Sequence, residues 1–350
     1  MNLFIEIAVS LLPSMALLLV FILMDSYKLL GIKAVVIAIV IGALSAIVSY
    51  FVNTPIVENS GLDWTTYSRY GAPLVEEFFK GAILVYFIRT SKIGFNVDAA
   101  IYGFALGAGF AIVENLYYVT VLDQDTNLGI FVIRGFGTAI MHGGTTTLFG
   151  IISKTMLDRK IWGEWGGFIP GFLTASVFHS FYNHFFFNPI LLTVITMVTL
   201  PLVLMVIFKR SEAFLQNWLG VGFDTDQDLL DMVNKGHVSD TNVGQYLESV
   251  KGRFPGEVVF DMICLLRIHL ELSMRAKGVL MMREAGMDSE PDPDIQDKFN
   301  ELHYLEKNIG KSGMLALSPF LHQSSQDLWQ IHMLDREMKV TLKEAFFEQL

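Results

Sequence analysis

Seven ionisable side chains and one asparagine interrupt the otherwise apolar first 210 residues of this chain. They are Glu76, Glu77, Lys80, Glu114, Arg134, His142, His179 and Asn183. A charge near the centre of a lipid-embedded helix costs roughly 2.5–3.5 kcal/mol, so such groups persist where they pair, face a wet cavity and serve a purpose. Their types and spacings predict a site for peptide-bond hydrolysis inside the membrane.

The densest part of this pattern is the run Glu76-Glu77-Phe-Phe-Lys80. The lysine follows the two carboxylates by three and four residues, so one helix face can hold all three groups. Two neighbouring carboxylates do not easily share one protonation state where the dielectric constant is low. We therefore expect one of them to take a proton from water, while Lys80 keeps the other ionised.

The remaining groups suggest partners for this pair. Glu114 can hold the same water or orient a histidine, and His142 can be a donor, a proton carrier or a metal ligand. His179 and Asn183 lie one helical turn apart, which suits two donors to a developing oxyanion. Arg134 is expected to support the site by pairing with an acid.

Two mechanisms follow from these residues. The leading hypothesis uses no cofactor: Glu77, helped by Glu76, activates a water that attacks the scissile carbonyl. The alternative is a zinc site with a bound water. Its expected ligands are Glu77, Glu114, His142 and His179.

Composition indicates which elements position these groups. Hydrophobic residues make up 52% of the 350 residues and charged residues only 17%, a balance typical of a membrane protein. With about 20 apolar residues needed per span, we expect an all-α, polytopic bundle of about seven spans. The expected spans lie near 3–24, 29–51, 73–89, 97–119, 130–152, 166–187 and 190–208. Gly103 and Gly107 have the small-xxx-small spacing of tightly packed helices.

The charges of the connections alternate and predict an orientation. Lysine and arginine gather after the first, third, fifth and seventh spans, whereas the other connections carry mainly acids. By the positive-inside rule, the N-terminus lies outside and residues 211–350 lie in the cytoplasm of a multi-pass cell-membrane protein. Glu76, Glu77, Glu114 and His179 then fall in the outer half of the bilayer.

Residues 211–350 form the second expected domain, after a protease-like helical domain at 1–210. The tail holds 13 Lys+Arg and 23 Asp+Glu, so it carries the whole net charge of −10 and argues against nucleic-acid binding. Apolar periodicity near 226–235, 255–284, 296–309 and 325–348 predicts a small α-helical cytosolic domain.

At this point the chain resembles the PrsW-type intramembrane proteases, in the wider glutamate-dependent clan that includes CAAX prenyl proteases. The matching motifs are EExxK (Glu76, Glu77, Lys80), FxxxE (Phe110, Glu114), His142, and HxxxN (His179, Asn183), in the family's order over about residues 70–190. CAAX proteases have a histidine in place of Glu114 and an arginine in the first motif, so the PrsW side is favoured. The tail has no counterpart in this resemblance.

The resemblance implies an intramembrane endopeptidase that cuts membrane-anchored proteins, as in regulated cleavage of an anti-sigma factor. The expected partners are the lipid bilayer and a single-pass membrane protein substrate. Two alternatives stay open: a non-catalytic scaffold or transporter that uses the same polar cavity, and a prenyl-protein (CAAX) endopeptidase. Transport would give ion-coupled flux abolished by Glu→Gln changes, and a CAAX substrate would present a lipidated cysteine from the cytosol.

Overall fold

The described part of the chain consists of helices joined by turns and irregular connections. The computed structural model describes residues 3–121, 128–235, 242–287, 294–318, 320–321, 324 and 326–336, and no strand occurs among them. The chain divides into two compact units, Met1–Glu212 and Ala213–Leu350. The expectation of an all-α protein is confirmed for these residues.

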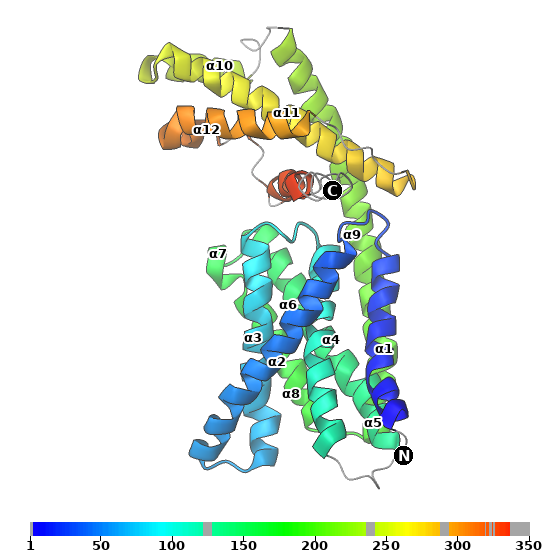
Figure 1. The fold of residues 1–350 in the computed structure, drawn as a ribbon. Coiled ribbons are helices and arrows are strands. Elements are labelled where there is room, and N and C mark those ends of the chain that lie inside the picture. The colour runs from blue at the N-terminus through cyan, green and yellow to red at the C-terminus, as the bar shows by residue number, and fades with distance from the viewer. Residues whose placement is uncertain are drawn as a thin grey trace, which may run out of the picture. The chain divides into compact units, whose positions relative to one another are not determined.

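The first unit is a bundle of helices joined by short connections (Figure 1). Its elements are α1 (Leu3–Leu23), α2 (Ile32–Ser60), α3 (Trp64–Arg89), α4 (Asn96–Val121), α5 (Leu128–Val132), the π-helix η1 (Ile133–Thr138), α6 (Ala139–Asp158), α7 (Gly163–Gly166), α8 (Ile169–Asn183) and the first part of α9 (Pro189–Asn234).

Four of these helices are long and apolar enough to cross a membrane, among the residues that the structure describes: α1, α2, α4 and α9. Three of the expected spans do not pass this test, each for a physical reason. Helix α3 carries Glu76, Glu77 and Lys80 at its middle. Helix α6 is long enough, but His142, Lys154 and its glycines and threonines make it too polar, and α8 has only 15 residues. The count of seven spans therefore stays a prediction.

Helix α4 is the buried centre of the first unit. In its most apolar window 83% of the residues are buried, against 17–33% in the other three candidate spans. It packs against α1, α2 and α6, and Figure 1 shows α2 lying obliquely across it. Because α4 is covered on several sides, Glu114 on this helix faces protein instead of lipid.

Glycines bring the helices next to α4 into close contact. A Cβ on Gly103 would lie 2.7 Å from Thr147 Cα, and one on Gly107 would lie 2.2 Å from the carbonyl oxygen of His142. On the other side of α4, a Cβ on Gly109 would lie 2.0 Å from the Ile39 carbonyl oxygen. The tight packing expected of these small residues is confirmed, and it sets the distance between α4 and the histidine of α6.

We expect Gly107→Ala to destabilise the protein by about 1–3 kcal/mol, the usual cost of overpacking. The added methyl group meets the backbone of α6, which cannot rotate out of the way as a side chain can. Thermal unfolding in detergent measures the effect. Gly31→Ala is the matched control, because its Cβ meets nothing within 4 Å. Equal shifts in the two variants would contradict this account of the α4–α6 contact.

The second unit consists of the end of α9, α10 (Asn242–Val250), the 3-10 turn η3 (Lys251–Arg253), α11 (Gly256–Glu284), α12 (Ile295–Leu317) and a helix at 326–336. A buried network joins three of them. Asp226 on α9 accepts hydrogen bonds from Lys277 Nζ (2.7 Å) and Ser273 Oγ (2.5 Å) on α11, and Gln330 Nε2 donates to Ser273 Oγ at 2.7 Å.

Candidate active site

Side chains from four helices meet in the first unit. Helix α3 supplies Glu76, Glu77 and Lys80, and the other three helices supply Glu114 (α4), His142 (α6) and His179 (α8). The rings of His142 and His179 lie 4.7 Å apart between centroids, at 88° to each other. The structure therefore brings together six of the eight residues singled out from the sequence, and Arg134 joins them through Glu114.

Glu77 contacts three other side chains of the cluster within hydrogen-bonding distance. Its Oε1 accepts from Lys80 Nζ at 2.6 Å and Thr145 Oγ1 at 3.0 Å, and it lies 2.8 Å from His179 Nδ1. Both Glu77 and Lys80 are completely buried. Its other oxygen, Oε2, has no hydrogen-bond partner among the described residues. One oxygen is thus held in place by neighbouring donors, while the second has an acceptor position left over.

Glu114 holds the other histidine. Its Oε2 lies 2.8 Å from His142 Nε2, and its Oε1 lies 3.2 Å from Arg134 Nη2. The second ring nitrogen of His142, Nδ1, lies 3.1 Å from Lys80 Nζ. Phe110 packs beside both, with Lys80 Nζ 4.6 Å from its ring centroid. Both defining residues of the FxxxE motif, Phe110 and Glu114, therefore contact the cluster.

Glu76 points in a different direction from its neighbour, because successive residues of an α-helix are about 100° apart. Its side chain is 16% exposed, and its Oε2 lies 3.7 Å from His179 Nε2. Glu76, His142 and His179 each offer one ligand atom, and these three atoms all lie within 4.8 Å of one another. Among the described residues, this is the group of histidine and acidic side chains that could hold a metal ion.

The donor set fits a catalytic metal ion. Two imidazoles and one carboxylate are the protein ligands of many catalytic zinc sites, in which a fourth position takes water. Metal-binding histidines usually pair their second ring nitrogen with a carboxylate or carbonyl group, which fixes their orientation. Here Glu77 lies against His179 Nδ1 and Glu114 against His142 Nε2. The surroundings of His179 match that pattern, because its Nε2 lies beside Glu76. On His142, Glu114 lies against Nε2 as in that pattern, and Nδ1, which lies 3.1 Å from Lys80 Nζ, would exchange this contact for the ion.

This arrangement differs from the zinc set expected from the sequence. That set placed Glu77 and Glu114 among the ligands, whereas the structure groups Glu76 with His142 and His179. The reason is that Glu77 is occupied by Lys80, Thr145 and His179, and Glu114 by His142 and Arg134. Sequence spacing alone cannot show which of two adjacent carboxylates faces a partner helix.

Asn183 lies outside this group. Its Nδ2 donates to the Ser68 carbonyl oxygen on α3 at 2.9 Å, and Ser180 Oγ donates to the Arg69 carbonyl oxygen at 2.6 Å. Pro73, inside α3, has no N–H to bond the Arg69 carbonyl four residues earlier. The proline therefore leaves an acceptor for α8, and these two bonds fix the turn of α8 that carries His179.

Thr145 is a site residue that the sequence interpretation missed. Its hydroxyl lies within hydrogen-bonding distance of both Glu77 Oε1 (3.0 Å) and the His142 carbonyl oxygen (3.2 Å). The neighbouring Thr146 hydroxyl donates to the His142 carbonyl oxygen. Thr145 follows His142 by three residues, a spacing that puts both on one helix face. This spacing was the signal in the sequence that could have identified Thr145 as a site residue.

Comparison with known families agrees with this geometry. Residues 31–208, more than half of the 350-residue chain, match the model of the PrsW family intramembrane metalloprotease. This match contains every residue of the cluster. No curated protein and no solved structure matches the chain.

The match corrects the expectation that no cofactor is needed. The family is one of metalloproteases, and the Glu76, His142 and His179 group offers donors for a metal ion. The metal-free hypothesis treated His179 and Asn183 as a pair of oxyanion donors. In the structure the Asn183 amide bonds the α3 backbone, while His179 lies beside Glu76 and His142. The chain belongs to the PrsW family of intramembrane metalloproteases.

Proposed function

We propose that this protein is an endopeptidase that hydrolyses a peptide bond in a membrane-anchored protein, with Glu76, His142 and His179 as the metal ligands. The observation that carries this proposal is the cluster itself: two histidines and a carboxylate gathered within 4.8 Å, with further carboxylates on both histidines. When bound there, a zinc-like ion would polarise the scissile carbonyl and make a bound water more acidic.

Glu77 is our candidate for the general base. Its Oε1 is fixed by Lys80, Thr145 and His179, and its Oε2 has no partner. We propose that Oε2 takes a proton from the attacking water as the carbon–oxygen bond forms. The same proton then passes to the leaving nitrogen as the carbon–nitrogen bond breaks, giving a carboxylate and an amine.

The other residues have positioning roles in this proposal. Lys80 balances the charge of Glu77 and lies 3.1 Å from His142 Nδ1. Glu114, paired with Arg134, orients His142. Asn183 holds α8 against α3 so that His179 meets Glu77. This assignment gives Asn183 a structural role, in place of the oxyanion-donor role that its spacing suggested.

The orientation and substrate class follow from the charge pattern. The lysines and arginines of alternate connections support seven spans, an N-terminus outside and a cytoplasmic acidic tail. On that topology Glu114 and His179 lie toward the outer ends of α4 and α8, which favours a single-pass substrate cut near its extracytoplasmic side. Regulated cleavage of an anti-sigma factor is a reaction of this kind.

Mapping of protein termini in membranes tests the proposed function. Cells carrying the native protein are compared with cells carrying Glu77→Gln and Glu58→Gln at equal expression. Glu58 is an exposed control carboxylate near the end of α2. We expect one membrane protein to accumulate uncut in the Glu77→Gln cells only, with loss of its cleaved terminus. An unchanged set of termini, together with ion flux that requires Glu77, would instead support a transporter.

A further inference from the structure

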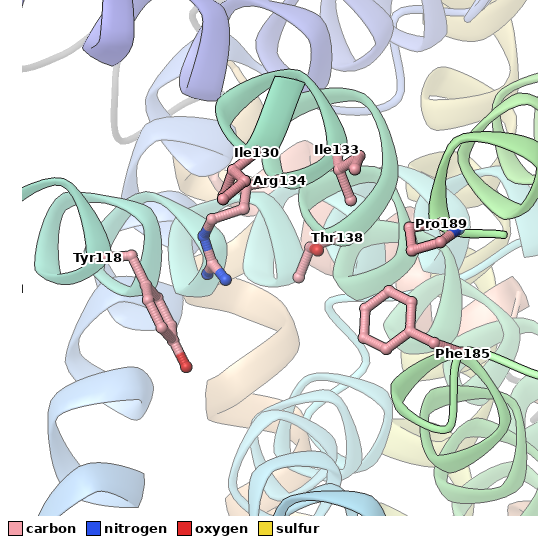
Figure 2. Close-up of a pocket in the computed structure, with 7 residues that line it drawn as sticks. All are labelled: Tyr118, Ile130, Ile133, Arg134, Thr138, Phe185 and Pro189. Atoms are coloured by element: carbon pink, nitrogen blue, oxygen red, sulfur yellow. The ribbon is translucent and has the colours of Figure 1, made fainter. Parts of the chain in front are cut away.

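A separate cavity opens beside the cluster. It has a volume of about 260 Å³ and a mainly apolar lining. The lining residues are Tyr118, Ile130, Ile133, Arg134, Thr138, Phe185 and Pro189. Figure 2 shows Phe185 and Pro189 facing Ile133 and Thr138, with Arg134 and Tyr118 at the other side. Arg134 also belongs to the ion pair with Glu114, so the cavity and the cluster share a wall.

The π-helix η1 builds much of this wall. Its hydrogen bonds join residues five apart, so Ile133 and Thr138 come onto one face together with Arg134. The glycines of the same segment pack elsewhere: a Cβ on Gly135 would lie 2.0 Å from the Val9 carbonyl oxygen. The segment is therefore anchored through Gly135, while Ile133, Arg134 and Thr138 border the cavity. Turns of π-helix are frequent at functional sites.

Arg134 has unused hydrogen-bonding capacity. Its guanidinium carbon lies 3.6 Å from the centroid of the Tyr118 ring, and its Nη2 lies 3.2 Å from Glu114 Oε1. Neither Nη2 nor Nε makes a hydrogen bond of suitable geometry among the described residues, although both atoms are buried. Leaving buried donors unsatisfied is costly. The Arg134 side chain is 13% exposed, and a turn of its guanidinium toward the cavity that paired these donors with a ligand carbonyl oxygen would relieve that cost.

The size of the cavity selects among ligands. An apolar cavity of about 150 Å³ admits benzene, whereas sites for drug-sized molecules measure about 300–1,000 Å³. A volume of about 260 Å³ therefore suits one large side chain, such as phenylalanine or leucine. A lipid is a poorer match, because its acyl chain is long and its phosphate would compete with Glu114 for Arg134.

The position of the cavity suits a peptide that also reaches the cluster. The path from Arg134 runs through Glu114 to His142, with contacts of 3.2 Å and 2.8 Å. An extended chain advances about 3.3 Å per residue. Because Arg134 borders the cavity and pairs with Glu114, a side chain in the cavity would belong to a residue a few positions from the bond at the cluster.

We propose that this cavity is a substrate-binding subsite, which takes one large apolar side chain of the membrane-anchored substrate while Arg134 donates to a neighbouring backbone carbonyl of that substrate. This proposal rests on the proposed function and deepens it by naming a specificity determinant. The substrate class is an extended peptide segment with a phenylalanine or leucine a few residues from the cut.

A set of synthetic single-span peptides tests the subsite by cleavage. The peptides differ at one outer-half position at a time, where alanine, leucine or phenylalanine is placed. Native protein is compared with Ile130→Phe, which fills the cavity, and with Val132→Phe. Val132 is exposed and does not line the cavity. We expect Ile130→Phe to lower kcat/KM for the phenylalanine peptide by at least about tenfold relative to the alanine peptide.

The Val132→Phe control should leave this ratio unchanged. The expected change should appear at only one peptide position, because a pocket receives one side chain of a bound segment. An unchanged ratio in Ile130→Phe at every position would overturn the subsite. Thr138→Val gives a second test without added bulk, because it makes the lining more apolar and should favour the phenylalanine peptide.

Cross-linking separates binding from cleavage. The same peptides carry a benzophenone side chain at the scanned position and are bound to Glu77→Gln protein. We expect cross-links to Ile133 or Phe185, and competition by the phenylalanine peptide. Such cross-links without any cleavage by native protein would support the subsite and reject the protease. Cleavage with cross-links only elsewhere, or a co-purified lipid lost in Arg134→Gln, would reject the subsite alone. No cleavage and no cavity cross-link would reject both.

Discussion

Replacement of Glu76 by glutamine is expected to remove both the bound metal and the proteolytic activity of the purified protein. Exchange of groups that only orient metal ligands costs about 10–100-fold in metal affinity. Glu76 is a proposed ligand, grouped with His142 and His179, so loss of its charge should cost at least about 100-fold. Metal content after dialysis and cleavage of the substrate found by terminus mapping are the two measurements.

Two controls make the Glu76 result specific. Glu58→Gln should keep both metal and activity, because Glu58 is exposed near the end of α2, a helix that supplies no residue of the cluster. Native protein stripped by a zinc chelator should lose activity and regain it when zinc is returned. If Glu76→Gln protein retained its metal but lost cleavage, Glu76 would be a base and not a ligand.

Replacement of Lys80 by methionine is expected to lower the free energy of unfolding by about 3–5 kcal/mol, the usual cost of removing one partner of a buried ion pair. Lys80 and Glu77 are both completely buried, with Nζ and Oε1 2.6 Å apart. The lysine also lies 3.1 Å from His142. Its removal leaves the Glu77 charge without compensation. Thermal unfolding in detergent measures the loss.

A double variant separates the effect of the uncompensated Glu77 charge from the effect of the lost packing of Lys80. In Lys80→Met/Glu77→Gln the charge is gone, so part of the stability should return, although activity should not. Lys235→Met is the exposed comparison: Lys235 and Asp231 lie 3.6 Å apart at the surface, and such pairs contribute about 0–1 kcal/mol. A double variant as unstable as Lys80→Met would attribute the loss to the packing of the lysine stem.

The helices of this chain could be predicted well where apolar composition and length determine where a helix lies. Expected spans at 3–24 and 97–119 lie close to α1 and α4. The expected segment at 296–309 ends where the structure has a break, because Gly310 adopts a φ of 68°. Beyond this kink a second helical stretch continues to Leu317. The π-helix could not be predicted, since no periodicity in Ile-Arg-Gly-Phe-Gly-Thr distinguishes i→i+5 bonds from α-helical ones.

The sequence predicted which residues gather at the candidate site, but not which of them contact one another. Motif spacing identified the residues that converge, because charged groups in apolar helices are rare. It did not show that Glu76, and not Glu77, faces the two histidines. It also missed Thr145, whose role depends on how closely α6 approaches α3. The spacing of glycines indicated that helices pack closely on α4, but it did not show which side chains of α3 and α6 this packing brings together.

The short length of α8 has a consequence for the surrounding lipid. Its 15 residues extend about 22 Å, whereas the hydrocarbon core of a bilayer is about 30 Å thick. As a span, α8 would therefore be shorter than the membrane, and lipids compress beside a short helix to remove that mismatch. His179 lies in the last two turns of this helix. The thinnest part of the membrane would then border His179, which would shorten the apolar path between bulk water and the cluster.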